Sequence, residues 1–113
     1  MIKRIIIDTD PGVDDALTFL LALASPEIKL EALTTVHGNT TIENTTRNAL
    51  AVLELLKARD IPVAKGTSLP LLVPLHKSDG EVHGRAGIGN SKLSEPSSSP
   101  IQQHAVDYLI ERV

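Results

Sequence analysis

The chain contains no cysteine and no tryptophan, and its only aromatic residues are one tyrosine and one phenylalanine among 113 residues. Without cysteine, disulfide bonds and thiol chemistry are excluded, which agrees with a reducing compartment. With so few aromatics, the core must be built from Ile, Leu, Val and Ala, which supply most of the 42% hydrophobic fraction. A chain of this length supports one compact domain, residues 1–113.

Clustered positive charge and long apolar runs are also absent. The 11 Lys and Arg are outnumbered by 14 Asp and Glu, for a formal net charge of -3. This balance argues against nucleic acid or an anionic membrane as the main partner. No apolar stretch is long enough to span a bilayer, and residues 1–4 run directly into strand-like residues without a signal peptide. We therefore expect a soluble cytoplasmic protein.

The most informative stretch present is IIIDTDPGVDDA, residues 5–16. Residues 5–7 are β-branched and continuous, which is typical of a strand buried on both faces of a parallel sheet. Pro11-Gly12 then predicts a turn, and from Val13 apolar residues recur at helical spacing. The apolar stripe expected to be buried consists of Ala16, Leu17, Leu20, Leu21 and Ala24, widened by Phe19 and Leu23.

Four acids flank this predicted turn: Asp8, Asp10, Asp14 and Asp15. Taken singly, Asp10 fits a helix N-cap, and Asp14 and Asp15 fit first-turn charges that complement the helix dipole. Four carboxylates converging in one cleft would repel one another unless a cation held them together. Because the ligands would be oxygens alone, the pattern predicts a Ca²⁺ or Mg²⁺ site rather than a Zn²⁺ site.

A second strand is predicted over residues 28–36, with Leu30, Ala32 and Val36 alternating against polar neighbours. It ends at His37-Gly38-Asn39, which places Asn39 at the same sheet edge as Asp10. A neutral amide there would orient a water or a sugar hydroxyl. The alternative is that Asn39 only ends the strand or makes an Asx turn.

Further along, Thr40 with Glu43 forms a capping-box pattern that predicts a helix to about Arg59, with Arg47 and Asn48 as solvated or helix-internal polar residues. Residues 61–64 predict a short third strand. Alternating strands and helices indicate an α/β fold, a Rossmann-like open parallel sheet with flanking helices. Neither the dinucleotide glycine fingerprint nor a P-loop follows any strand, which disfavours NAD(P) and P-loop nucleotides.

Residues 66–100 are rich in Gly, Pro and Ser and are predicted to form a long active-site loop or flap. It carries His83, which could contact the base of a ligand, although a single loop histidine is more often a surface residue. Ser99-Pro100 predicts the start of a last helix that continues to Val113. No stop signal follows, so we expect an amino-terminal part of a longer protein, with an open sheet edge beside the third strand that favours oligomers.

Three of the motifs described above resemble those of a known enzyme family. The stretch from Asp8 to Ala16 resembles the amino-terminal signature of the inosine-uridine preferring nucleoside hydrolases. The segment from Thr34 to Asn39 and the pair His83-Gly84 match that family in type and spacing. The resemblance covers essentially all of this chain but only about the first third of the family's usual length.

The resemblance implies a truncated nucleoside hydrolase fold and hydrolysis of the N-glycosidic bond of ribonucleosides to ribose and free base. It makes Asp10 and Asp15 ligands of Ca²⁺, and Asp10 also the general base for a metal-bound water. Asp14 would grip the ribose hydroxyls and Asn39 would help to place water and sugar. These roles suit a reaction in which positive charge builds on the sugar.

Two further residues take roles from the same resemblance. His83 belongs to a segment that lies over the family's active site, and Asp8 would orient the metal ligands without touching the ion. The family completes its metal shell and sugar contacts with residues from later segments that are absent here. We therefore predict that this chain alone is nearly inactive and binds Ca²⁺ weakly, and that purine or pyrimidine preference is not encoded in it. A homo-oligomer is expected for the full-length protein.

Two other hypotheses remain open at this point. An apolar strand followed by Asp8-Thr9-Asp10 resembles the opening of haloacid dehalogenase-like phosphohydrolases, with Asp8 as nucleophile and Asp10 as acid/base. That motif prefers Thr or Val where this chain has Gly12, and it leaves Asp14 and Asp15 unexplained. The third hypothesis is a non-catalytic fragment or an assembly module.

Overall fold

The computed structural model describes residues 1–75 and 82–113, so residues 76–81 of the predicted flap lie outside the described residues. The elements follow one another as β1 (Lys3–Thr9), α1 (Val13–Ala24), β2 (Ile28–Thr35), α2 (Ile42–Leu55), β3 (Val63–Lys65) and α3 (Ala105–Arg112). The strands form one parallel sheet in the order β1-β2-β3. This arrangement confirms the α/β fold with an open parallel sheet and flanking helices.

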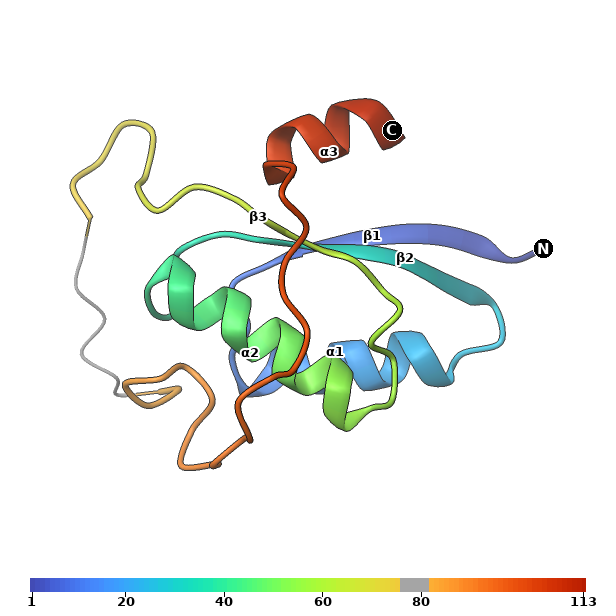
Figure 1. Cartoon of the computed structure of the whole chain (residues 1–113), viewed down its shortest axis with the longest axis horizontal. Helices are drawn as coiled ribbons and strands as arrows, with labels where there is room; N and C mark the ends of the chain where they lie inside the picture. Colours follow the sequence, from blue (N-terminus) through green and yellow to red (C-terminus); the bar gives the residue numbers. More distant parts are fainter. Residues whose placement is uncertain (76–81) are drawn as a thin grey trace.

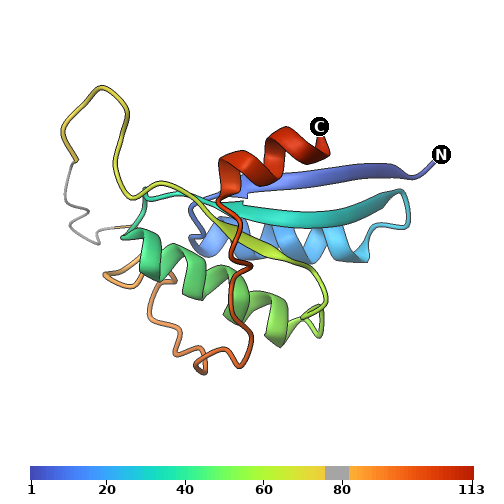
Figure 2. The ribbon, with the colours of Figure 1, turned by 45° about the horizontal axis from the view of Figure 1, so that its top comes forward.

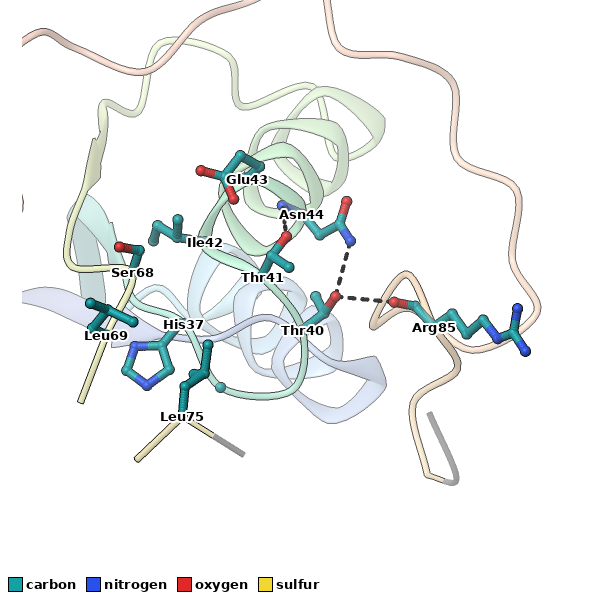
Figure 3. A pocket seen from close by; sticks show the side chains of 11 residues that line it. His37, Thr40, Thr41, Ile42, Glu43, Asn44, Ser68, Leu69, Leu75 and Arg85 are labelled. Atoms are coloured by element: carbon teal, nitrogen blue, oxygen red, sulfur yellow. Dashed lines mark hydrogen bonds between the residues drawn. The ribbon is translucent and has the colours of Figure 1, made fainter. Parts of the chain in front are cut away.

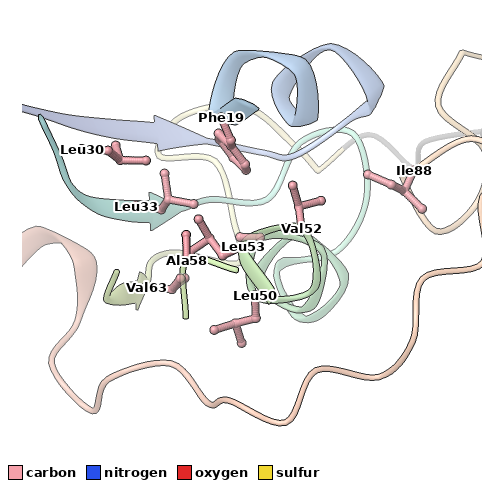
Figure 4. Packing of buried hydrophobic residues seen from close by; sticks show 10 residues of the cluster. Phe19, Leu30, Leu33, Leu50, Val52, Leu53, Ala58, Val63 and Ile88 are labelled. Atoms are coloured by element: carbon pink, nitrogen blue, oxygen red, sulfur yellow. The ribbon is translucent and has the colours of Figure 1, made fainter. Parts of the chain in front are cut away.

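The sheet is the middle layer of three. Helices α1 and α2 lie on one face and α3 lies on the other (Figures 1 and 2). The main core fills the space under α1 and α2, as Figure 4 illustrates, and its buried members are Phe19, Leu30, Leu33, Ala49, Leu50, Val52, Leu53, Ala58, Val63 and Ile88. A smaller cluster under α3 consists of Ala32, Ala64, Ala105 and Tyr108. No helix in the described ranges combines the length and apolar character needed to cross a membrane.

Strand β2 is buried on both faces, so the alternation predicted for it is wrong at its end, where Thr35 is 1% exposed. The pairing register shifts after Ile5, which pairs with Leu30, because the next pair joins Ile6 to Ala32. The extra residue in β2 forms a bulge there. The bulge allows Leu30 and Leu33 to enter the main core while Ala32 between them faces α3.

Helix α1 has the predicted extent, and its predicted buried face is right for Phe19, Ala16 and Leu23 but wrong for three leucines. Its buried residues are Phe19 and Ala22. Leu17, Leu20 and Leu21, which the stripe placed in the core, are 65%, 48% and 69% exposed. The helix has apolar residues around most of its surface, so spacing alone did not select the face that packs on the sheet.

Helix α2 begins one residue later and ends earlier than predicted. Thr41 rather than Thr40 is the N-cap, and its hydroxyl accepts the backbone N–H of Asn44. At the other end Lys57 adopts a positive φ of 58°. The N–H of Ala58 donates to the Leu53 carbonyl and that of Lys57 to the Glu54 carbonyl. These two bonds form a Schellman motif, which ends the helix before Arg59.

The last helix also differs from the prediction. It begins at Ala105 with His104 as N-cap, not at Pro100. The residues before it are extended, and the Ile101 N–H donates to the Val63 carbonyl while Ile101 forms a parallel bridge with Ala64. The edge of β3, predicted to be open, is therefore partly paired. Pro100 matches a helix start in sequence, but backbone pairing with the sheet takes precedence.

Candidate functional site

Asp10 and Asn39 meet at the carboxyl ends of β1 and β2. The backbone N–H of Asn39 donates to Asp10 Oδ2 at 2.7 Å, and Asn39 Nδ2 donates to the Asp10 carbonyl at 2.8 Å. The second bond fixes the orientation of the Asn39 side-chain amide, so its Oδ1 points away from the Asp10 carbonyl. The predicted convergence of these two residues at one sheet edge is confirmed, because the parallel strands bring their carboxyl ends together.

The turn that carries Asn39 is fastened to α2 by threonine hydroxyls. The hydroxyls of Thr35 and Thr46 hydrogen bond at 2.8 Å, and the Thr45 hydroxyl donates to the Val36 carbonyl at 2.9 Å. Thr45 is fully buried, and Thr35 and Thr46 are at most 4% exposed. These bonds satisfy polar groups between strand and helix, so the turn that presents Asn39 has a fixed place.

Asp15 is held by groups of the β1–α1 turn. Its Oδ1 accepts the Thr9 hydroxyl at 2.7 Å and its Oδ2 accepts the backbone N–H of Gly12 at 2.9 Å. Gly12 is the N-cap of α1, so Asp15 at the third helical position supplies half of a capping box. Asp10 is thus not the N-cap, contrary to the alternative interpretation of its sequence position. Asp15 therefore has a capping role in the β1–α1 turn.

His83 comes to the same turn from a distant part of the chain. Its Nδ1 accepts the backbone N–H of Val13 at 3.3 Å and lies 3.9 Å from an Asp14 carboxylate oxygen. An imidazole nitrogen that accepts a hydrogen bond is unprotonated, so a neutral His83 carries its proton on Nε2. The structure therefore brings His83 and Asp14 together. The Asp14 side chain is 81% exposed and that of His83 is 21% exposed.

Gly12 and Gly38 allow these side chains to approach. A Cβ on Gly12 would lie 2.6 Å from His83 Nδ1 and 2.9 Å from Asn39 Nδ2. A Cβ on Gly38 would overlap the Asp10 carboxylate. Neither glycine has a positive φ, so the close approach of these side chains, and not the backbone conformation, favours glycine at both positions. From the sequence, both glycines are expected only as turn residues.

Asp8 lies apart from this group. Its Oδ1 accepts the Thr34 hydroxyl at 2.6 Å from the adjacent position of β2. Thr34 is fully buried, while Asp8 is exposed. This bond fixes the Asp8 side chain against the neighbouring strand, and no hydrogen bond joins Asp8 to the other three acids within the described residues.

Two residues outside the predicted site, Asn48 of α2 and Thr40 just before its N-cap, contact the segment 83–89. Asn48 is 2% exposed and its Nδ2 donates to the Ala86 carbonyl at 2.6 Å, so of the two predicted alternatives it is helix-internal and not solvated. The Thr40 hydroxyl donates to the Arg85 carbonyl at 3.0 Å. A polar residue beside Ala49 on an apolar helix face was the only available signal, because the partner lies 38 residues away.

A cavity of about 620 Å³ lies beside the turn that follows β2 (Figure 3). Its wall includes Gly38, Thr41 and Leu69 but none of the four acids near β1. Glu43, which also lines it, has a pKa below its ordinary value of 4.5, chiefly because the carboxylate accepts its own backbone N–H and secondarily because Lys65 lies 3.4 Å away. Besides Gly38, which adjoins Asp10, the cavity wall includes Thr40 and Arg85.

The donor chemistry of the turn fits a hard divalent cation, since Asp10 and Asp15 offer carboxylate oxygens. The number of donors is smaller than Ca²⁺ uses, because that ion takes about six to eight oxygens. Within residues 1–75 and 82–113, no group of three or more His, Cys, Asp or Glu side chains is arranged to hold a metal ion. Asp10 and Asp15 therefore fit as part of a calcium shell and not as a complete one.

Comparison with known proteins defines the class to which this fold and turn belong. The sequence model of the inosine-uridine preferring nucleoside hydrolases matches residues 5–113. The pyrimidine-specific ribonucleoside hydrolase RihA of Salmonella enteritidis is 50% identical over 109 residues, which are 96% of this chain and 35% of RihA. The chain belongs to the inosine-uridine preferring nucleoside hydrolase family.

Solved structures agree with this assignment. The plant nucleoside hydrolase PpNRh1 superposes with a TM-score of 0.92 at 43% identity, over 97% of this chain and 35% of that one. A purine-preferring ribonucleoside hydrolase from Gardnerella vaginalis superposes with a TM-score of 0.88 at 35% identity, over 96% of this chain and 35% of that one. The chain spans about a third of the length of these relatives. The family match supports the nucleoside hydrolase hypothesis over the haloacid dehalogenase-like phosphohydrolase hypothesis.

Proposed function

We propose that this chain supplies the water-activating and sugar-binding third of a ribonucleoside hydrolase. The observation that carries the proposal is the arrangement of Asp10 and Asn39, locked together by two hydrogen bonds with Asp15 and His83 at the same turn. Relatives named as ribonucleoside hydrolases match nearly the whole chain. The reaction is cleavage of the bond between ribose C1′ and a base nitrogen by water.

In this proposal Asp10 accepts a proton of the attacking water as the new C1′–O bond forms, and the base leaves with the electrons of the broken C1′–N bond and takes up a proton from solvent. The Asn39 N–H holds one oxygen of Asp10 in place, so the other is presented to the water without rotation of the carboxylate. Asp14, whose side chain is exposed in the first turn of α1, accepts hydrogen bonds from ribose hydroxyls. His83 Nε2 faces the base end of the substrate.

Asp10 and Asp15 would hold Ca²⁺, and Asp8, which the Thr34 hydroxyl fixes against β2, would not touch the ion. Bound Ca²⁺ would supply positive charge that acidifies a water and anchors the ribose diol. The bonds from Thr9 and Gly12 to Asp15 keep its carboxylate in one orientation, which reduces the reorganisation needed on binding. Remaining oxygens would have to come from outside this chain.

A chimaera tests the proposal, with the chain replacing the matching third of RihA. We expect release of free base from a ribonucleoside in the presence of Ca²⁺. Asp10→Ala in the chimaera should lower kcat by at least about 10²-fold, since general acid–base catalysis contributes 10² to 10⁴. The same change should abolish Ca²⁺ uptake in calorimetry. Asp60→Ala, at an exposed aspartate outside the site, is the matched control and should change neither.

The 113-residue chain alone, mixed with Ca²⁺ and inosine or uridine, should release base at or near the uncatalysed rate. Robust turnover by the chain alone would contradict the need for further donors. Full activity of Asp10→Ala in the chimaera would contradict the role of Asp10. A well-folded chimaera that releases no base would instead favour a non-catalytic fragment or assembly module.

A further inference from the structure

The segment 83–89 rests on the amino-terminal half of α2 and is attached there by two side chains. Thr40 donates its hydroxyl to the Arg85 carbonyl at 3.0 Å, and Asn48 donates its amide to the Ala86 carbonyl at 2.6 Å (Figure 3 for Thr40). Thr40 also accepts the side-chain amide of Asn44 at 3.0 Å, which fixes the direction of its own hydroxyl proton. Consecutive carbonyls of the segment therefore have donors from α2 and from the residue just before its N-cap.

The fit between segment and helix is close. Gly87 has a φ of +82°, and a Cβ there would lie 2.8 Å from the Thr40 methyl and 3.3 Å from the Asn48 amide. Ile88 next to it is 7% exposed in the main core. A glycine-rich segment has large conformational freedom when unattached, so these contacts are what select one conformation.

The anchored residues lie close to His83 in the chain, so their attachment to α2 also restricts the position of His83. His83 lies three residues before Ala86, and the Gly89 N–H donates to the His83 carbonyl, closing the segment into a loop. From there the imidazole reaches Val13 at the start of α1. No helix or strand of this structure includes His83, so its position depends on where the loop is held.

We propose that Asn48 and Thr40 are positioning residues that hold segment 83–89 on α2 and thereby place the His83 imidazole at the β1–α1 turn, beside the substrate. The role in placing His83 against a nucleoside rests on the proposed function, whereas the attachment of the loop does not. Loss of either donor leaves a carbonyl without its partner and releases the loop. The His83 side chain then leaves the Val13 N–H.

The attachment can be tested on the chain itself by NMR. Asn48→Asp keeps the shape of the side chain but removes the N–H donor, and we expect it to accelerate hydrogen exchange of the Gly87 and Gly89 amides at least tenfold. It should shift the Val13 amide resonance in the direction produced by His83→Ala. Asn90→Asp, at an exposed residue just after the same segment, is the matched control and should do neither.

A second pair of variants keeps the test decisive if Asn48→Asp fails to fold. Thr40→Val retains the methyl group that contacts Gly87 but has no hydroxyl, and Thr40→Ser retains the hydroxyl. We expect Thr40→Val to reproduce the fast exchange and the Val13 shift, and Thr40→Ser to restore slow exchange. Equal behaviour of the two variants, or unchanged exchange in Asn48→Asp, overturns the proposal.

The link to the substrate is tested in the RihA chimaera by combining variants. Asn48→Asp and His83→Ala should each raise KM about tenfold, and Asn48→Asp should add no further loss when His83 is already Ala. Multiplying losses would mean that Asn48 acts independently of His83 and would overturn the positioning role. If the chimaera with the unaltered chain releases no base, the proposed function fails, and the exchange experiment alone decides whether Asn48 and Thr40 hold the loop.

Discussion

Gly12 occupies the point where side chains from two other segments of the chain converge. His83 and Asn39 both lie within 3 Å of where its Cβ would be. Its φ of -107° suits any residue, so Gly12→Ala adds no backbone strain. The displaced atoms are the ends of side chains, which can rotate away at little expense in stability.

We expect Gly12→Ala to keep the fold while separating His83 from Asn39. The NMR resonances of the Asn39 side-chain amide and the Val13 backbone amide should shift, with little change in Tm. Gly38→Ala is the informative comparison, because there the new Cβ meets the Cβ and carboxylate of Asp10, which the Asn39 N–H holds. Gly38→Ala should therefore lower Tm more than Gly12→Ala. Unchanged Asn39 and Val13 resonances in Gly12→Ala would contradict the predicted displacement.

Glu54 gives a prediction on pH. Its carboxylate accepts the Ser97 N–H at 2.8 Å and the Ser97 hydroxyl at 2.9 Å, and Arg59 lies 3.8 Å away. These bonds, the N–H first, lower the pKa of Glu54 from its ordinary value of 4.5. Because the folded pKa is depressed, the attachment of Ser97 is complete above pH 4.5 and is lost as pH falls through the folded pKa.

The Ser97 amide resonance reports this attachment directly. Its pH titration should have a midpoint below 4.5, and Glu54→Gln should remove that transition. Since the Glu54 side chain is partly exposed, we expect local release of the segment around Ser97 rather than global unfolding. A midpoint at or above 4.5 would contradict the prediction.

At the residue scale, the sequence predicts correctly which residues meet at the ends of adjacent parallel strands. Asp10 and Asn39 were expected at one edge because parallel topology dictates it. The partners of Asp15 were not foreseen, since a carboxylate at the third helical position and a threonine hydroxyl can each bond in several ways. The contact of Asn48 was not foreseen because its acceptor belongs to a loop whose path over α2 leaves no periodic signal.

At the scale of elements, the carboxyl end of α2 carries a local conflict. Lys57 occupies the left-handed position of the Schellman motif, where an L-residue with a Cβ costs about 1–2 kcal/mol. Glycine relieves that strain but loses about 0.5–1 kcal/mol through greater freedom of the unfolded chain. The net effect of Lys57→Gly should be a stabilisation of about 0.5–1 kcal/mol.

Thermal and urea denaturation measure this effect. Tm should rise by about 2–8 °C, given that 1 kcal/mol shifts Tm by about 4–8 °C in a small domain. Lys57→Ala is the matched control: it removes the same charge but keeps the Cβ, so it should not stabilise the fold. Equal stabilisation by both variants would assign the effect to the charge instead of the backbone.

The types of the elements were predictable from periodicity and turn residues, while several ends and faces were not. α3 begins after Ile101 because the Ile101 N–H finds a backbone acceptor in β3, a long-range bond that no local pattern reveals. Thr41 replaces Thr40 as the cap because Thr40 bonds to Arg85 instead. In both cases a tertiary partner took a group that local rules had assigned to a helix.

At the scale of the whole molecule, the β1 edge of the sheet has no neighbouring strand within the described residues. Among the described strands β1 pairs only with β2, so the N–H and C=O groups of its other edge have no strand partner in residues 1–75 and 82–113. Helix α1, adjoining β1 in the chain, exposes Leu17 and Leu21 one turn apart on the same face. An unpaired strand edge and a contiguous apolar surface both favour association.

We therefore expect the 113-residue chain to self-associate as its concentration rises, through this surface of α1. The double variant Leu17→Glu and Leu21→Glu should shift it toward monomer in light scattering and sedimentation velocity, because Glu keeps helix propensity while charging the face. Leu55→Glu, at an isolated exposed leucine of α2, should leave the association unchanged. If the double variant associates as strongly as the parent, the open β1 edge rather than α1 drives assembly, since backbone pairing is indifferent to these side chains.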